Sequence, residues 1–344
     1  MIQRRHAEIF LALAKQAEPE LWGPEAEQWL DRLEREHEHF KSAMRWSLGR
    51  GDAATALRIG SALTRFWQLR GHAAEGLEWL QTSLAGGGGV PAPLRARALS
   101  SAGNLALAND DARQSTQYLE QALELWRGLG ERGSMAVTLD TLAALARDRG
   151  DLAEARELYQ ETLAVFRVLG DKTAVAASLN NLATVYTHLG DQEEARALYE
   201  ESLTLFEELE DERGVATAIV NIGMLMARTQ GDFEQAMALA TEGLDMFAKQ
   251  GAKEEIADCL AELGEVARGQ DKLQEAARFF GTAETLRGMR GQTPPATDYQ
   301  AFNERIAARH ANQDLTSLYA AWAEGRATAV QLAEAYGWGE HAEE

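Results

Sequence analysis

The sequence repeats itself at Gly150-Asp151-Leu-Ala-Glu-Ala-Arg-Glu-Leu-Tyr159 and again at Gly190-Asp191-Gln-Glu-Glu-Ala-Arg-Ala-Leu-Tyr199. Related segments surround five aspartates, Asp111, Asp151, Asp191, Asp232 and Asp271, and subtracting their residue numbers gives spacings of 40, 40, 41 and 39. A fixed period of this length is typical of a solenoid, in which one supersecondary unit stacks on copies of itself. The repeat therefore predicts an array that presents a surface to a partner.

Each repeat unit contains the apolar pattern of two helices separated by a short turn. Between residues 176 and 210, the first helix has an apolar face at Leu179, Leu182, Ala183 and Tyr186. The second helix has a matching stripe at Ala195, Leu198, Tyr199, Ser202 and Leu203. Gly190 suits the left-handed end of the first helix, and Asp191 suits the N-cap of the second. We therefore predict an all-α fold without strands, and we interpret the five repeated aspartates as helix caps rather than a catalytic row.

The composition argues against several classes of partner and location. The chain has 344 residues and a net charge of −20, so nucleic-acid phosphates and anionic membranes would be repelled at long range. Its single cysteine excludes an internal disulfide and favours a reducing compartment. The sequence has no secretory signal and no apolar run of about 18 residues that could span a membrane. We therefore expect a cytoplasmic protein.

The densest cluster of titratable residues is Glu36-His37-Glu38-His39. His37 and His39 are two residues apart, so on a helix they point about 200° away from each other. A zinc-binding histidine pair on a helix needs a spacing of four residues. We therefore interpret the cluster as a solvated helix face and predict no metal site.

The other candidates for chemistry are structural by the same reasoning. Cys259 has no partner thiol and stands beside the packing positions Leu260 and Leu263, so we interpret it as a small buried side chain. Gly86 to Gly89 are interpreted as a linker, because no Lys-Ser/Thr follows as a phosphate-binding loop requires. The sequence suggests no set of nucleophile, base and orienting residue. We therefore predict a protein that is not an enzyme and that uses no cofactor.

The repeat resembles a known family. Leu182-Ala183, Tyr186, Ala195, Tyr199 and Ser202 match the Leu-Gly/Ala, Tyr, Ala, Phe/Tyr and small-residue pattern of the tetratricopeptide repeat. The unit is longer, about 40 residues against roughly 34, and we expect the extra residues in the connections after Gly170, Glu210 and Gly251. The resemblance implies a right-handed α-solenoid of antiparallel helix pairs, a tetratricopeptide-like superhelix. About five such repeats would occupy residues 91–290.

The flanking parts of the chain resemble segments of bacterial signalling proteins. Residues 1–90 contain Trp22, Trp29, Trp46, Trp67 and Trp79 in characteristic elements, and the tail contains Ala320-Ala-Trp-Ala-Glu-Gly325. This arrangement resembles the region after the ATPase core of STAND-class ATPases, including LuxR-type and MalT-like transcription regulators. The sequence lacks their phosphate-binding loop and basic DNA-binding segment, so the resemblance does not imply ATP hydrolysis or DNA binding. We expect residues 1–90 to be helical with degenerate repeats, and residues 291–344 to cap the array with short helices at 298–309, 315–324 and 330–336.

The family resemblance also implies where a ligand would bind. In tetratricopeptide arrays the first helix of each pair lines the concave groove through residues off its packing stripe. These positions are Arg65, Asn104, Asp140, Ala144, Arg147, Asn180, Thr184, Thr187, His188, Asn221, Met224, Arg228, Glu265 and Arg268. Asparagine can donate to and accept from a peptide backbone, and arginine binds carboxylates with two parallel bonds. The alternative is that these are ordinary solvent-facing helix residues.

Three functions stay open at this stage, and the third, an enzyme that uses the solenoid as a scaffold, would need a clustered acid–base pair that the sequence does not show. The first is a non-enzymatic module that binds a protein, a peptide or a small effector as the sensor or scaffold of a bacterial signalling or transcriptional regulator. The second is a stand-alone tetratricopeptide adaptor that tethers protein partners without an effector. Neither of these two functions involves direct contact with nucleic acid or membrane. Self-association is a further option if Trp29, Trp46 and Trp67 form an exposed edge, although core positions suit these side chains better.

Overall fold

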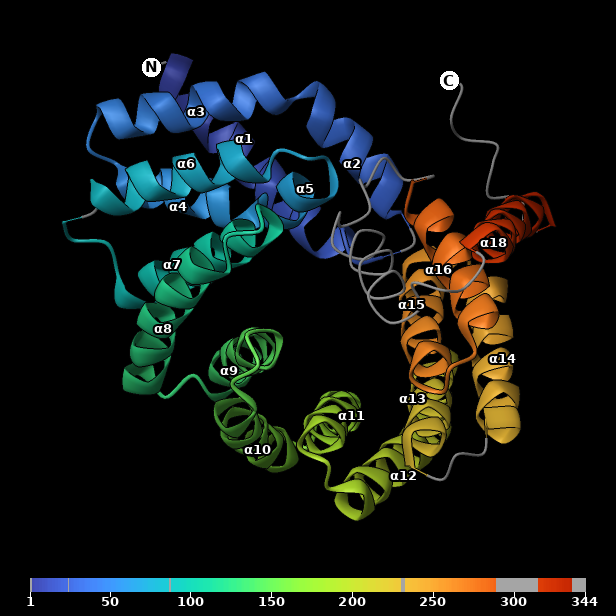
Figure 1. The fold of residues 1–344 in the computed structure, drawn as a ribbon. Coiled ribbons are helices and arrows are strands. Elements are labelled where there is room, and N and C mark those ends of the chain that lie inside the picture. The colour runs from blue at the N-terminus through green and yellow to red at the C-terminus, as the bar shows by residue number, and fades with distance from the viewer. Residues whose placement is uncertain (1, 24, 87, 230–232, 289–314, 336–344) are drawn as a thin grey trace. The chain divides into compact units, whose positions relative to one another are not determined.

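The computed structural model describes residues 2–23, 25–86, 88–229, 233–288 and 315–335, and every regular element within them is an α-helix (Figure 1). The chain divides into two compact units, Met1–Gly170 and Asp171–Glu344. None of the described helices is long and apolar enough to cross a membrane. The all-α prediction is therefore confirmed for the described part of the chain.

The first unit begins with irregular helices and ends with regular pairs. Its described helices are α1 (Ile2–Glu20), α2 (Ala26–Arg35), α3 (His37–Gly49), α4 (Ala53–Ala62), α5 (Thr64–Leu69), α6 (Ala73–Ala85), α7 (Ala92–Ala108), α8 (Ala112–Leu129), α9 (Arg132–Asp148) and α10 (Leu152–Leu169). Helix α7 packs against α8, and α9 packs against α10. Helix α1 instead contacts both α3 and α4, so the N-terminal helices form a bundle rather than simple pairs.

The second unit continues the pairs and ends with one long helix. Its described helices are α11 (Lys172–Leu189), α12 (Gln192–Glu208), α13 (Glu212–Thr229), α14 (Phe233–Lys249), α15 (Lys253–Gly269), α16 (Leu273–Gly288) and α18 (Leu315–Ala335). The pairs are α11 with α12, α13 with α14, and α15 with α16. The first helices of these pairs are also neighbours, because α13 contacts both α11 and α15. We call α11, α13 and α15 the inner helices.

The turns between helices are shorter than the sequence suggested. Only Gly170 and Asp171 separate α10 from α11, and Gly170 takes a left-handed φ of 72° that ends α10. Helices α10 and α11 each contain 18 residues. The prediction that the extra residues lie in the connections is wrong at this turn, because they lengthen the helices.

The repeated aspartates are not all equivalent. Asp111 caps α8, where its side chain accepts from the backbone N–H of Gln114 at 2.8 Å. Asp151 and Asp191 occupy N-cap positions without a side-chain capping bond. Asp271 is not an N-cap: its φ of 65° is left-handed, and it follows the C-cap of α15. The cap interpretation is therefore wrong for Asp271, while Asp232 lies outside the described residues.

The C-terminal helices also differ from the prediction. The two short helices expected at 315–324 and 330–336 form a single helix, α18, which spans 21 residues. Gly325 lies within it because α18 crosses α16 closely there, and a Cβ at this position would lie 2.1 Å from the carbonyl oxygen of Arg278. The glycine thus permits close helix packing instead of ending the helix. The helix expected at 298–309 lies outside the described residues.

The core of the first unit centres on aromatic residues of its N-terminal helices. Phe40, Phe66 and Trp67 have no exposed surface. Trp29 and Trp46 are half-buried and pack against the same cluster. These tryptophans therefore stabilise the bundle, in agreement with the expectation that they are core residues.

Candidate functional site

The inner helices of the second unit bring two predicted asparagines together. Asn180 of α11 and Asn221 of α13 are 41 residues apart in sequence, and Nδ2 of Asn221 donates to Oδ1 of Asn180 at 3.0 Å. Asn180 is buried, with 7% of its surface exposed, whereas Asn221 is half-buried. Oδ1 of Asn221 accepts no hydrogen bond from the described residues. Asn180 therefore orients Asn221 and leaves an amide oxygen that can accept from a ligand.

A second polar network lies one turn further along α11. The Thr184 hydroxyl donates to the carbonyl oxygen of Asn180 at 3.1 Å and lies 3.0 Å from the Tyr199 hydroxyl. Because the single proton of Thr184 is used, the Tyr199 hydroxyl must be the donor of that second bond. Burial raises the pKa of Tyr199, so the phenol stays neutral. His188 continues the face, with Nδ1 2.8 Å from the carbonyl oxygen of Thr184.

A cleft of about 470 Å³ lies between the C-terminal ends of α13 and α15, and its lining includes Arg228, Glu265, Arg268 and Gln270. Nε of Arg268 donates to Glu265 at 2.9 Å, so this guanidinium is already paired. Gln270 closes one side by donating to the carbonyl oxygen of Ala227 at 3.0 Å. Arg228 is exposed and forms no ion pair within the described part of the chain. Its guanidinium is therefore available to an anionic group.

Two other predicted residues have side chains that are already committed to intramolecular contacts. Met224 is only 4% exposed and belongs to the core of the second unit. In the first unit, Nε of Arg65 donates to the carbonyl oxygen of Leu21 at 2.9 Å, and its guanidinium lies 3.6 Å from the ring centroid of Trp22. Asn104 is half-buried, and its bond with Gln68 at 3.3 Å uses the backbone carbonyl oxygen, so it does not commit the side-chain amide. Arg65 thus fastens the segment after α1 to α5.

The pair of α9 and α10 contains a buried hydroxyl, that of Tyr159, without a hydrogen-bond partner among the described residues. Asp140 and Arg147 are half-buried there, and Nη2 of Arg147 donates to Asp148 at 2.9 Å. The Tyr159 hydroxyl of α10 is buried and has no hydrogen-bond partner among the described residues. The repeat explains this, because Ala144 stands 40 residues before Thr184 and has no hydroxyl to offer. The same burial raises the pKa of Tyr159.

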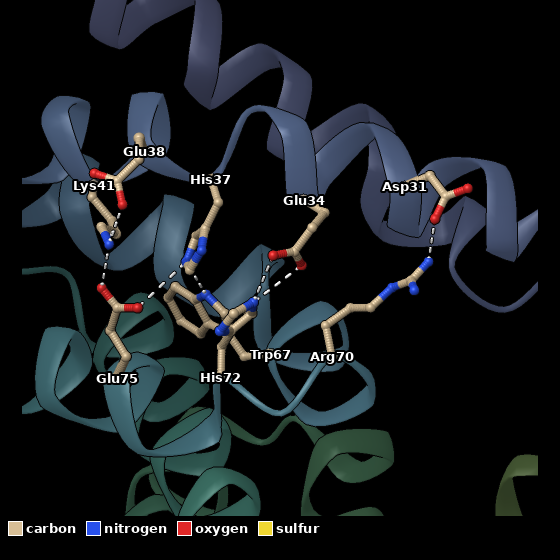
Figure 2. Close-up of polar contacts among 9 residues, drawn as sticks. All are labelled: Asp31, Glu34, His37, Glu38, Lys41, Trp67, Arg70, His72 and Glu75. Atoms are coloured by element: carbon tan, nitrogen blue, oxygen red, sulfur yellow. Dashed lines mark hydrogen bonds and ion pairs between the residues drawn. The ribbon is translucent and has the colours of Figure 1, made fainter. Parts of the chain in front are cut away.

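The histidine cluster is not the solvated face that the sequence suggested. His37 is buried with 7% of its surface exposed, while His39 is exposed. The ring of His37 instead faces His72, with 4.4 Å between ring centroids, and Glu34 lies beside His72 (Figure 2). The spacing of His37 and His39 in the sequence could not reveal the contact with His72, because His72 lies in the turn before α6. The interpretation of a solvated face is therefore wrong for His37.

Cys259 packs on α15 as a structural residue. It is half-buried against the core cluster of the second unit. Burial raises the pKa of its thiol, so the reactive thiolate is disfavoured. Neither observation gives the cysteine a chemical role.

Comparison with known proteins agrees with this architecture. Residues 94–167, 134–208 and 173–249 each match the family model of the tetratricopeptide repeat. No curated protein sequence matches the chain significantly. Among solved structures, a Rap protein complexed with Competence and Sporulation Factor is 13% identical to this chain, with a TM-score of 0.59. The aligned region covers 98% of this chain and 99% of the Rap protein chain.

Two further structures have similar folds. NprR in complex with its cognate peptide NprX is 16% identical to this chain, with a TM-score of 0.58. The aligned region covers 93% of this chain and 95% of the NprR chain. A STAND protein with a tetratricopeptide repeat sensor from Pyrococcus horikoshii is 12% identical with a TM-score of 0.57 and covers 98% of this chain. This chain spans 54% of the length of that protein. At these identities the likeness concerns the fold, and the chain carries tetratricopeptide repeats across residues 94–249 within an all-α solenoid.

Proposed function

We propose that the chain is a non-enzymatic recognition module that binds an extended peptide segment on the inner helices α11, α13 and α15. Tetratricopeptide repeats occur over residues 94–249, and solenoids of this type present extended binding surfaces. The polar residues of the inner helices are joined by bonds that fix side-chain orientation, as a binding surface requires.

The observation that carries the proposal is the arrangement of Asn221 and Arg228 on one face of α13. Asn221 is oriented by Asn180, and Arg228 lies in the adjoining cleft without an ion pair among the described residues. Seven residues are close to two helical turns, so both side chains lie on the same face about 10 Å apart. An extended peptide advances about 3.3 Å per residue, so the two groups match positions about three residues apart. The expected ligand donates a backbone N–H to Asn221 and places a carboxylate at Arg228.

The wider role that we propose is that of a sensor or scaffold in a bacterial signalling or transcriptional regulator. Support comes from the fold shared with NprR, solved with its cognate peptide, and with the sensor-bearing STAND protein. In this role the bound peptide is the signal.

The test is selection of linear peptides from a random displayed library on the full chain, followed by affinity measurement with the enriched peptides. Asn221→Ala and Arg228→Ala remove the two proposed contacts, and Arg196→Ala on α12 is a matched control for the loss of one exposed arginine. A charge-assisted bond contributes about 1.5–3 kcal/mol, so Arg228→Ala should weaken binding at least about tenfold. Arg196→Ala should leave the affinity unchanged.

Two outcomes contradict the proposal. One is enrichment of no peptide above a scrambled-sequence background. The other is equal weakening by Arg196→Ala and Arg228→Ala, which would mean that overall charge rather than the inner face determines binding. Circular dichroism of each variant verifies that the helices are retained.

A further inference from the structure

The geometry points to a binding site for a divalent transition metal of the zinc class, formed by Glu34, His37 and His72 in the first unit (Figure 2). Each residue offers one ligand atom, and the three atoms lie within 4.8 Å of one another. Two imidazole nitrogens and one carboxylate oxygen are a donor set that zinc accepts. The inner-helix site of the second unit contains none of these residues, so this inference is independent of the proposed function.

Three separate segments bring the ligands together. Glu34 lies in the last turn of α2, and His37 is the first residue of α3. Helical bonding continues through Glu36 at the junction, because its N–H donates to the carbonyl oxygen of Arg32 at 3.2 Å and its carbonyl oxygen accepts from the N–H of Phe40 at 3.2 Å. Residues three apart on such a path lie on the same side, and Glu34 and His37 therefore face one way. His72 is the N-cap of α6 and meets them from the other side, as Figure 2 shows.

The distances are already close to those of a metal centre. Nε2 of His72 lies 3.0 Å from both carboxylate oxygens of Glu34. Tetrahedral zinc with bonds of about 2.0–2.1 Å holds its ligand atoms about 3.3–3.4 Å apart. Glu34 and His72 have nearly this separation. The ligand atom of His37 lies within 4.8 Å of the other two, so a rotation of its side chain would have to bring it closer by up to about 1.5 Å.

The surroundings favour the ligating forms of the side chains. An indole nitrogen can only donate, so the contact of Trp67 Nε1 with His37 Nε2 at 3.4 Å leaves Nε2 unprotonated. This hydrogen bond is long, and a metal ion can replace it as the partner of the lone pair. Burial and the neighbouring His72 lower the pKa of His37, which favours the neutral imidazole that binds metal. Phe66 and Trp67, both without exposed surface, form an apolar wall that limits competition from water.

A further carboxylate lies beside the ligating nitrogen of His37. Oε2 of Glu75 lies 3.7 Å from Nε2 of His37, and the other oxygen of Glu75 pairs with Lys41 at 3.0 Å. Because Nε2 is also the nitrogen that would bind the metal, Glu75 lies on the ligand side of the ring and would add negative charge beside the ion. A metal ion here would join α2, α3 and the turn before α6. Its role would be to clamp the N-terminal bundle, in a part of the chain that does not follow the regular pairing of the repeats.

The test is zinc titration of the full chain after removal of metal with a chelator, followed by calorimetry and metal analysis. His72→Gln and Glu34→Gln each remove one ligand that is partly exposed, so the fold should survive. His39→Gln is the matched control, since His39 is exposed, stands two residues from His37 and is not among the three ligands. We expect one zinc ion per chain, at least tenfold weaker binding by both ligand variants, and unchanged binding by the control.

Thermal unfolding and cobalt spectroscopy give readouts that an ordinary ion pair would not produce. Zinc should raise the Tm of the wild type and of His39→Gln, and not that of His72→Gln. Cobalt should give the visible absorption of a low-coordinate site in the wild type and not in His72→Gln. Absence of zinc binding, or equal affinity of the wild type and His72→Gln, would overturn the proposal and leave Glu34 and His72 as an ion pair only.

Discussion

Tyr159 and Tyr199 occupy the same position in successive repeats, and removal of their hydroxyls should have opposite consequences. Both phenols are buried, at 0% and 3% exposure. The Tyr199 hydroxyl bonds to Thr184 at 3.0 Å, whereas the Tyr159 hydroxyl has no partner among the described residues. The perturbation is the replacement of each tyrosine by phenylalanine, which removes one oxygen atom and keeps the ring.

The magnitudes follow from the cost of burying a polar group. A buried hydroxyl without a partner costs about 1–3 kcal/mol, so Tyr159→Phe should be neutral or stabilise the fold by about 1 kcal/mol. The bond of Tyr199 contributes about 0.5–1.5 kcal/mol, so Tyr199→Phe should destabilise by about 1 kcal/mol. The two variants should therefore differ by about 1–2 kcal/mol. A change of 1.4 kcal/mol corresponds to about tenfold in an equilibrium constant.

The assay is native-state hydrogen exchange, because repeat arrays open locally and a single unfolding midpoint would average the two units. Amide protection in α10 should rise or stay unchanged in Tyr159→Phe, while protection in α12 should fall about fivefold in Tyr199→Phe. Equal loss of protection in both variants would refute the reasoning, because it would mean that the Tyr159 hydroxyl has a stabilising partner.

Two further pairs of substitutions test the packing and the caps. Gly76→Ala should destabilise by about 1–3 kcal/mol, since its Cβ would lie 2.2 Å from the Trp67 ring, whereas Gly128→Ala, with nothing within 4 Å, should stabilise by up to about 1 kcal/mol. Urea denaturation measures both, and equal effects would contradict the tight contact with Trp67. Asp171→Ala should cost about 1 kcal/mol because its carboxylate accepts a backbone N–H at 3.0 Å, whereas Asp191→Ala, which loses no such bond, should cost less. Thermal unfolding distinguishes them, and a larger loss for Asp191→Ala would disprove the capping argument.

Much of the repeat region could be predicted from sequence because its signals are local and periodic. The spacing of 40 residues predicts which residues of neighbouring repeats come together, and Asn180 and Asn221, 41 residues apart, do bond. The periodic pattern does not tell whether a residue faces solvent or a neighbouring helix when its own helix packs against two other helices. The repeat pattern predicts Met224 on the groove face, yet Met224 is buried because α13 packs on both α14 and α15.

The Glu34–His37–His72 cluster could not be predicted from the periodic pattern. His72 is 35 residues from His37 and enters from a turn in the irregular N-terminal bundle, where no repeat fixes the pairing of segments. The one available signal was the spacing of three between Glu34 and His37, which places both on one side of a helical path. The spacing of His37 and His39 gives no such signal, because residues two apart point to different sides of a helix.

The most direct test of the account is a structure of the full chain with the tightest-binding peptide from the library selection. The account predicts an extended peptide along α11, α13 and α15, with a backbone N–H at Oδ1 of Asn221 and a carboxylate at Arg228. A peptide bound to the outer helices α12 or α14, or one that leaves both side chains without contact, would contradict the central claim that the inner helices are the recognition surface.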